Sequence, residues 1–345
     1  MTTIKDVARE AGVSVSTVSR VLAHHPDVSA ATASRVQQVI DRWQFSVNRN
    51  AQHLKQSATM TILVAVKGRH NLLFAAMLEH VQAAVTATGH TVVTQYLDED
   101  ANEVAEAERL VTEIKPRGVV FLGADADHVA TNAVRIGEQC PAVVLTNSVA
   151  SAGRSAVSSV TTDDRVAAQL ATEHLLGRGH RRIGVVGGDI DASTISLHRH
   201  EGVLAALKAA GVEFDCDRQY VGTRYSLRCG YEAAIDLTTR LPDLTAIYAM
   251  SDIMALGAMR GLYEQGLTVP DDISLIGHDG IELASYVVPK LVTIEQPQET
   301  MARRGVEVLM RHIEGDLDPV EEFVPVRIVA GESVRDIRFG STSSD

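Results

Sequence analysis

The sequence is poor in the features that mark membrane proteins, disulfide-rich folds and metal sites. Its three cysteines, Cys140, Cys216 and Cys229, are scattered and show no metal-ligand spacing, so we expect reduced, buried thiols. No apolar run approaches the roughly 18 residues that a membrane helix needs. The first residues also lack the charged and then apolar start of a secretory signal. We therefore expect a cytoplasmic protein with no membrane partner.

Signatures of the common enzyme classes are missing as well. The chain has no G-x-S-x-G, H-E-x-x-H or P-loop motif, and no G-x-G-x-x-G in the required setting between a strand and a helix. The glycine-rich run at residues 184–188 fits a buried strand better than a nucleotide-binding loop. The sequence thus predicts a binding protein rather than an enzyme, and it indicates no cofactor.

What the chain does have is enough length, 345 residues, for two or three folding units. Its net charge of −12 argues superficially against a nucleic-acid partner. The charge is uneven, however, because residues 1–57 carry seven basic and four acidic side chains and the remainder carries 25 basic and 40 acidic ones. A basic head on an acidic body is expected if only the head meets phosphate, although a solvated helical face can reach the same excess.

The first 45 residues or so have the pattern of three short amphipathic helices. Thr3 can cap the first helix, which Gly12 ends, whereas Ser14 and Ser29 can cap the second and the third. The turn at residues 11–13 has the length that helix-turn-helix units use between their first two helices. The segment therefore predicts a small, all-α helix-turn-helix domain.

Past residue 60, β-rich runs alternate with amphipathic helices, which is the pattern of doubly wound parallel sheets. Roughly 280 residues are too many for one such sheet, so we expect two similar lobes with a ligand between them, at the carboxyl ends of the strands. The expected strands are 61–66, 91–96, 118–122, 142–146, 183–186, 246–249 and 273–276, and the expected helices are 74–88, 101–114, 164–177, 198–210, 228–239 and 252–265.

Residues 3–22, TIKDVAREAGVSVSTVSRVL, closely resemble the opening of the lactose-repressor/galactose-repressor (LacI/GalR) family, whose pattern runs roughly T-I-x-D-V-A-x-x-A-G-V-S-x-x-T-V-S-R-V-L-N. The chain departs from that pattern at Ala23, where the family usually has Asn. The likeness continues through the body, in Gly179–Ile183, Asp252–Gly257, Val269–Ser274 and Leu291–Ile294. It implies an α/β fold class, with a helix-turn-helix head and a two-lobed, doubly wound sensor like that of periplasmic binding proteins.

The resemblance also implies boundaries and a function. We expect a DNA-binding domain at 1–46, a hinge helix or linker at 47–58, and an effector-binding and dimerisation domain at 59–345. Lobe 1 should comprise about 59–159 plus 293–322, and lobe 2 about 160–292 plus 323–340. Such a protein represses transcription from a pseudo-palindromic operator in double-stranded DNA, under the control of a small molecule. No leucine heptads follow the last expected strand, so a homodimer is favoured over a tetramer.

A helix-turn-helix presents the first residues of its second helix to base edges in the major groove. Val15, Ser16 and Arg20 match the base-reading positions of the family, and Arg20 can fork onto guanine O6 and N7. The alternative is a protein-docking module in which Arg20 is merely solvated. The full DNA-binding set that the resemblance implies is Thr3, Ser14, Val15, Ser16, Thr17, Ser19, Arg20, Asn48, Ala51, Leu54 and Lys55.

Residues 45–55, FSVNRNAQHLK, resemble the family's hinge, commonly Y-x-P-N-x-x-A-x-x-L. A helix of two turns is marginal alone in water, so it should order only when it pairs with its twin on DNA. Leu54 matches the residue that wedges into the minor groove in the family. Val47 replaces the proline and Gln52 a frequent arginine. A plain linker with a solvated leucine is the alternative.

Six residues match effector-binding positions of the family's sensor: Leu73, Phe74, Arg199, Tyr225, Ser251 and Asp279. An acid and an arginine can chelate vicinal hydroxyls while aromatic side chains cover the apolar face of a sugar ring. We therefore expect a carbohydrate effector, with nucleosides and phosphorylated sugars as the alternatives.

Four of these residues also have a structural alternative. Phe74 and Tyr225 could belong to the core, Arg199 could pair with Glu201, and Asp279 could cap the following helix. Two histidines flank Arg199, but residues at i and i+2 of a helix point apart, so we expect no metal site there. A transport receptor would share the body, but it would need a signal peptide instead of a DNA-binding head.

Overall fold

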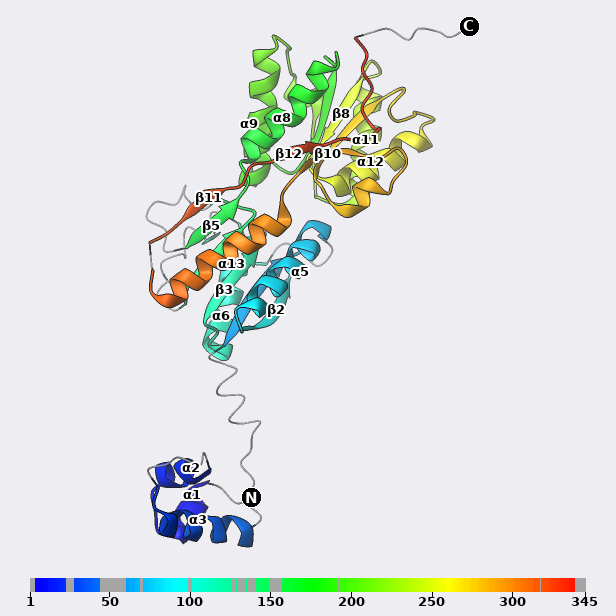
Figure 1. Ribbon diagram of the computed structural model, residues 1–345. Coiled ribbons are helices and arrows are strands. Elements are labelled where there is room, and N and C mark those ends of the chain that lie inside the picture. Colours follow the sequence, from blue (N-terminus) through cyan, green and yellow to red (C-terminus); the bar gives the residue numbers. More distant parts are fainter. Residues whose placement is uncertain are drawn as a thin grey trace. The chain divides into compact units, whose positions relative to one another are not determined.

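The structure is a computed structural model that describes residues 4–22, 28–43, 60–68, 71–98, 101–125, 128–129, 135, 140–148, 157–191, 193–316 and 318–338. Its chain divides into two compact units, Met1–Thr59 and Met60–Asp345 (Figure 1). The first is the helical head and the second is the α/β body, and each is described by itself.

The described residues of the head form three helices, α1 (Ile4–Ala11), α2 (Val15–Leu22) and α3 (Ala30–Arg42). Gly12 has a φ of +63°, and the amides of Gly12 and Val13 donate to the carbonyls of Arg9 and Ala8. This pattern ends a helix with a left-handed residue, which glycine adopts without steric cost. The expected cap Ser29 accepts a hydrogen bond from the amide of Thr32. The helices bury Val7, Ala8, Ala11, Val18, Val21, Val36, Val39 and Ile40.

Two six-stranded sheets form the body. The first has the order β11-β5-β4-β3-β1-β2 and is parallel throughout. Its strands are β1 (Thr61–Lys67), β2 (Thr91–Leu97), β3 (Gly118–Leu122), β4 (Ala142–Leu145), β5 (Ser158–Thr161) and β11 (Glu321–Phe323).

The second sheet has the order β12-β10-β9-β8-β6-β7, and only the pairing of β12 with β10 is antiparallel. Its strands are β6 (Ile183–Gly187), β7 (Tyr220–Gly222), β8 (Ala246–Ala249), β9 (Ser274–Asp279), β10 (Val292–Glu295) and β12 (Arg327–Val329).

Helices cover both faces of each sheet, because the central strands are buried on both sides and need two apolar layers. On the first sheet, α5 (Leu72–Ala87) and α13 (Gln298–Glu314) lie side by side on one face, and α6 (Glu103–Ile114) covers the other. On the second sheet, α8 (Asp164–Gly177) packs with α9 (Thr194–Ala209) on one face, and α11 (Leu227–Arg240) with α12 (Asp252–Glu264) on the other. The described part of the body also contains two short helices, α10 (Cys216–Gln219) and η2 (Glu282–Ser285).

All seven expected strands and all six expected helices are present, with ends that differ by a few residues. The largest difference is at α9, which begins at Thr194, four residues before the expected start. The chain passes between the sheets after β5, β10 and β11. These three strands end at Thr161, Glu295 and Phe323, each within a few residues of the lobe boundaries expected at about 159, 293 and 322.

Candidate functional site

The second helix of the head presents an exposed polar edge. Ser14 caps this helix, since its Oγ accepts from the amide of Thr17 at 3.1 Å, and it also lies 2.7 Å from Ser16 Oγ. Val15, Ser16 and Arg20 are exposed, whereas Thr17 is half-buried. The head core therefore leaves the expected base-reading residues on the surface. The side chain of Ser19 and the residues Thr3, Asn48, Ala51, Leu54 and Lys55 lie outside the described residues.

The body holds a cavity of about 680 Å³, to which the carboxyl ends of strands in both sheets contribute. All six residues that the sequence singled out for the effector line it. The other lining residues are Lys67, Gly68, Asn71, Gly123, Asp125, Thr146, Asn147, Gly188, Asp189, Ser193, Thr194, Ile195, Thr223, Ser226, Leu227, Arg228, Ile253, Ile281 and Gln296. We call this cavity the cleft.

Arg199, on α9, is held by a buried ion pair rather than by its helical neighbour. Its Nε donates to Asp164 Oδ1 at 2.7 Å, and its Nη1 donates to the carbonyl of Met250. Glu201 pairs instead with Arg165, at 2.6 Å, so the alternative pairing of Arg199 is wrong. Burial alone would lower the pKa of Arg199, but the charge of Asp164, together with smaller contributions from Tyr225, Asp279 and Tyr248, more than offsets burial and raises the pKa. The guanidinium is therefore cationic and fixed in direction.

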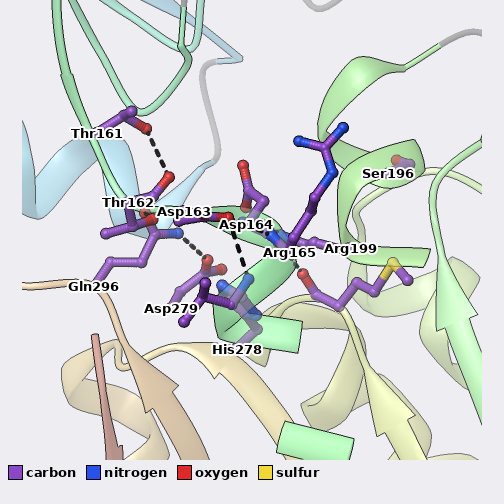
Figure 2. Close-up of polar contacts among 12 residues, drawn as sticks. Thr161, Thr162, Asp163, Asp164, Arg165, Ser196, Arg199, His278, Asp279 and Gln296 are labelled. Atoms are coloured by element: carbon purple, nitrogen blue, oxygen red, sulfur yellow. Dashed lines mark hydrogen bonds and ion pairs between the residues drawn. The ribbon is translucent and has the colours of Figure 1, made fainter. Parts of the chain in front are cut away.

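Asp279 ends β9 in a strained backbone conformation, with a φ of +114°. Left-handed values this large cost a non-glycine residue roughly 1–3 kcal/mol and concentrate at functional sites. Gln296 Nε2 donates to its Oδ1 at 2.9 Å, and Thr162 Oγ1 donates to Gln296 Oε1 at 3.3 Å. Figure 2 shows this chain, which joins the acid to residues that directly follow β5 and β10. No cap hydrogen bond from Asp279 is recorded for the following helix, whose N-cap is Ile281.

Burial raises the pKa of Asp279 to about 7, against the opposing effect of Arg199. The neighbouring Asp252 is fully buried, and burial followed by the charge of Asp279 raises its pKa well above the usual range. Thr293 Oγ1 and the amide of Ile281 donate to the Asp252 carboxyl group, at 2.6 and 2.9 Å. Two buried carboxyl groups therefore lie close together, and the negative charge of either one disfavours ionisation of the other. Asp279 is the one that lines the cavity.

Two aromatic side chains form apolar walls, each against a glycine at the end of a strand. A Cβ at Gly123, after β3, would lie 2.3 Å from the ring of Phe74. A Cβ at Gly188, after β6, would lie 2.7 Å from the ring of Tyr225, whose hydroxyl is 3.0 Å from Ser196 Oγ. Both rings line the cavity as well as packing against the core. The hypothesis that Phe74 and Tyr225 belong to the hydrophobic core therefore describes only part of their surroundings.

Four helices begin at the cleft, as expected where parallel strands end. Their N-cap residues are Asn71 (α5), Ser193 (α9), Ser226 (α11) and Ser251 (α12), and each side chain accepts an amide hydrogen bond from the first turn. Ser251 Oγ is engaged with the amide of Met254 at 3.2 Å. The structure thus gives Ser251 a capping role at the position that the sequence assigned to the effector.

The sequence interpretation missed several polar lining residues, all of which lie at the ends of strands or soon after them. Lys67 ends β1, Asp125 follows β3, Thr146 and Asn147 follow β4, and Asp189 follows β6. Thr146 has a φ of +83°, which is a genuine outlier for a β-branched residue. Polar residues directly after a buried strand were the available signal, because they gather at the carboxyl edge of a parallel sheet.

Two further searches of the described residues bear on function. None of their histidine, cysteine and acidic side chains form a group of three or more that could hold a metal ion. No helix among them is both long and apolar enough to cross a membrane.

An exposed helix of helix-turn-helix type in one unit and a cleft between two doubly wound sheets in the other define a ligand-regulated DNA-binding protein. Comparisons with known proteins give the same class. Residues 3–48 match the family "Bacterial regulatory proteins, lacI family", and residues 172–334 match "Periplasmic binding protein-like domain". The HTH-type transcriptional regulator MalR of Clostridium butyricum is 32% identical over 333 residues, 96% of this chain and 98% of that protein.

Solved structures agree. The transcriptional regulator CelR in complex with cellobiose matches with a TM-score of 0.71 and 28% identity, over 96% of this chain and all of that one. The Lac repressor dimer bound to operator and the anti-inducer ONPF matches with a TM-score of 0.74 and 25% identity, over 97% and 99% of the two chains. The protein belongs to the LacI family of bacterial transcriptional regulators. These relatives are regulators and not enzymes.

Proposed function

We propose that this protein is a repressor that binds a pseudo-palindromic operator as a homodimer and that releases or holds it according to a carbohydrate bound in the cleft. The observation that carries the proposal is the cleft itself, where a fixed cation at Arg199 and a buried acid at Asp279 line one cavity with two aromatic rings. An arginine and an acid bind vicinal hydroxyls, and rings cover the apolar face of a sugar.

For DNA, we assign residues 1–46 to the reading head and 47–58 to a hinge. Val15, Ser16 and Arg20 would meet base edges, and Ser14, Thr17, Ser19 and Thr3 would position the head on phosphates. In the hinge, Asn48, Ala51 and Lys55 would follow the minor groove, and Leu54 would wedge into the central step. Because the partner is DNA, we place the protein's action in the cytoplasm, at the nucleoid.

The homodimer would be formed by residues 59–345. Three large apolar side chains are exposed on or just after η2, namely Leu283, Tyr286 and Val288, the last of them 94% exposed. Contiguous exposed apolar surface on a soluble protein commonly marks an interface. The dimer in the Lac repressor structure supports a second copy of the chain as the partner.

The carbohydrate assignment draws on the cellobiose in the CelR structure as well as on the chemistry of the cleft. Leu73 and Phe74 would pack on the sugar from the first lobe, and Tyr225 from the second. Arg199 and Asp279 would take its hydroxyls. Ser251 would act through the helix that it caps, since its hydroxyl is already bonded.

Selection of bound sequences from a random DNA library, followed by gel shifts with the most enriched sequence, tests this function. We expect the enriched sequence to be palindromic and the shifted band to contain a protein dimer. The logarithm of operator affinity should fall with the logarithm of salt concentration, with a slope of magnitude roughly 5 or more, because several phosphate contacts release counterions. A slope near zero, or selection of no sequence, would show that the head does not read DNA.

A further inference from the structure

We propose that Asp252 is a positioning residue, which holds the backbone turn after Asp279 and thereby aims the carboxyl group of Asp279 into the cleft. The inference rests on the proposed function, because it assigns a supporting residue to the same effector site. Asp252 itself is fully buried and is not among the residues that line the cleft. It therefore acts on a ligand through Asp279 and not by contact.

The chain turns sharply where β9 ends. Asp279 and Gly280 both have a positive φ, of +114° and +70°. A non-glycine residue keeps such a conformation only when its surroundings hold it there. On one side of the turn, the amide of Gln296 donates to the carbonyl of Asp279 at 3.1 Å. The other side presents the next two amides of the chain, those of Gly280 and Ile281.

Both of these amides are bound by one pair of buried side chains, Asp252 and Thr293. The amide of Ile281 donates to Asp252 Oδ2 at 2.9 Å, and the amide of Gly280 donates to Thr293 Oγ1 at 3.3 Å. Thr293 Oγ1 in turn donates to Asp252 Oδ1 at 2.6 Å. Both carboxyl oxygens of Asp252 are thus engaged with the turn, one directly and the other through Thr293.

Capping of α12 does not account for Asp252. Ser251 already caps this helix, since its Oγ accepts from the amide of Met254 at 3.2 Å. An acid at the first position of a helix would favour the helix dipole from an exposed place as well. The side chain of Asp252 reaches instead to residues that are 29 and 41 positions further along the chain. Because a buried carboxyl group is costly unless it is hydrogen-bonded, its burial here points to the turn that it holds.

The neighbouring strand leaves room for this carboxyl group. Gly277 lies on β9 two residues before Asp279, and an added Cβ there would lie 2.2 Å from Asp252 Oδ1. A similar arrangement exists at α8, whose first residue, Asp164, is buried and holds Arg199 at 2.7 Å. The cation and the acid that we expect to bind hydroxyls are therefore each held by the buried first residue of a helix.

Hydrogen–deuterium exchange of the full chain tests the positioning without any ligand. Asp252→Ala removes both acceptors, so the amides of Gly280 and Ile281 should exchange about tenfold faster or more, measured by mass spectrometry on peptides that span residues 276–286. Asp252→Asn keeps one accepting oxygen and should restore part of the protection. Exchange in Asp252→Ala that is as slow as in the parent would overturn the proposal.

Ser333→Ala is the control for a general loss of stability. This buried hydroxyl bridges the other ends of β9 and β10, because it donates to the carbonyl of Leu275 and accepts from the amide of Val292. Ser333→Ala should leave exchange in the peptides of residues 276–286 as in the parent. Equal acceleration in Ser333→Ala and Asp252→Ala would mean that no specific support of the turn is lost, and would refute the positioning role.

A second pair of variants serves if Asp252→Ala does not fold. Thr293→Val keeps the shape of the side chain and removes its hydroxyl, whereas Thr293→Ser keeps the hydroxyl. Exchange of the same peptides should be faster in Thr293→Val than in Thr293→Ser. Equal rates in these two variants would show that the buried pair does not hold the turn.

Calorimetry with cellobiose and with ribose measures the consequence for binding. Asp252→Ala should weaken binding by about tenfold or more in the parent, but by less than about twofold in an Asp279→Asn background, because the two residues act through one contact. Asparagine at position 279 keeps an accepting oxygen, so residual binding is measured at high sugar concentration. An equal loss in the two backgrounds would mean that Asp252 acts by another route, and would overturn the proposal.

Failure of the proposed function is distinguishable from failure of this inference. A parent protein that binds neither sugar would count against the carbohydrate effector, whereas the exchange rates still decide whether Asp252 holds the turn. Loss of selective operator binding in gel shifts would refute the repressor function and would leave the exchange rates unchanged.

Discussion

At the scale of single residues, Asp279 combines three features that cost stability in the folded protein. The residue is buried, its backbone lies in the left-handed region and its carboxyl group shares a small volume with Asp252. None of these properties stabilises the folded state. Each of them is useful if a ligand must find a desolvated acceptor in a fixed direction, because an acceptor deprived of water binds a donor more strongly.

Asp279→Asn should therefore change stability in a way that depends on pH. The folded pKa of about 7 lies above the unfolded value of about 3.9. The folded state therefore binds the extra proton between these values, and the free energy of unfolding falls as pH rises from about 4 to 7. The variant lacks this loss, so it should be more stable than the parent at pH 8, by up to about 4 kcal/mol. Denaturant titrations at pH 5 and pH 8 measure the difference.

Asp272→Asn is the control of opposite sign. Hydrogen bonds from Thr268 lower the pKa of this exposed acid, so its contribution to stability is present at neutral pH and disappears as pH falls below 4. The variant should lose stability at pH 8 and should keep its affinity for a cleft ligand. If Asp279→Asn showed no gain at pH 8, the raised pKa of Asp279 would be refuted.

Arg20→Ala tests whether the head reads bases through this side chain. The side chain is exposed on α2, one helical turn beyond Ser16, and a bidentate contact to guanine contributes about 1–3 kcal/mol of discrimination. We expect a loss of that size on the selected operator and a relaxed preference at one position per half-site. Arg35→Ala, on the exposed surface of α3, is the matched control. Equal weakening on all sequences would make Arg20 a phosphate contact.

At the scale of elements, the ends of the strands decide the shape of the cleft. Gly188 follows β6, and an added Cβ would lie 2.3 Å from Ser196 Oγ and 2.7 Å from the Tyr225 ring. Gly188→Ala should therefore displace Tyr225 and weaken effector binding by tenfold or more, which corresponds to about 1.4 kcal/mol. Calorimetry with a sugar that stabilises the full chain in a thermal-shift screen measures this change.

Gly177→Ala is the control for that substitution. Gly177 ends α8, and a Cβ there would meet nothing within 4 Å, so the variant should bind the same sugar with unchanged affinity. If Gly188→Ala bound the sugar as tightly as Gly177→Ala, Tyr225 would not be a wall of the ligand site.

The same elements show what the sequence could predict. The seven expected strands are apolar runs bounded by turns, and their alternation with helices was sufficient for the fold class. Five short strands were missed, because runs of three or four residues carry no usable period: β5, β7, β10, β11 and β12. The helix α13 was missed although Met301, Ala302, Gly305, Val306 and Leu309 mark its buried face at helical spacing.

For the site, the family resemblance identified residues whose side chains line one cavity. It could not identify the side chains with which these residues form ion pairs and hydrogen bonds. Arg199 pairs with Asp164, which is 35 positions earlier, and not with the nearby Glu201. That choice depends on the packing of α8 against α9, which no local pattern encodes. The position of Asp125 and Asp189 in the cleft could have been predicted from the sequence, because each follows a buried strand.

At the scale of the whole molecule, control of operator binding by a cleft ligand requires energetic coupling between the two units. A ligand can shift operator affinity only by its differential affinity for the two states of the body. A 100-fold shift needs about 2.7 kcal/mol of coupling, and by reciprocity the operator must change ligand affinity by the same factor. Within the body, the hydrogen-bonded chain from Asp279 through Gln296 to Thr162 reaches two of the three crossings between the sheets. A ligand that contacted Asp279 would therefore act on a hydrogen-bonded chain that ends where the two lobes are joined.

The most direct test is an anisotropy titration of the selected operator with the full chain, without sugar and with a saturating concentration of the sugar that gives the largest thermal shift. In the parent protein we expect the sugar to change the operator Kd by tenfold or more. In Arg199→Ala we expect no change, although the variant should still bind the operator in one of the two states. An operator Kd that is the same with and without the bound sugar in the parent would show that the cleft does not control the head.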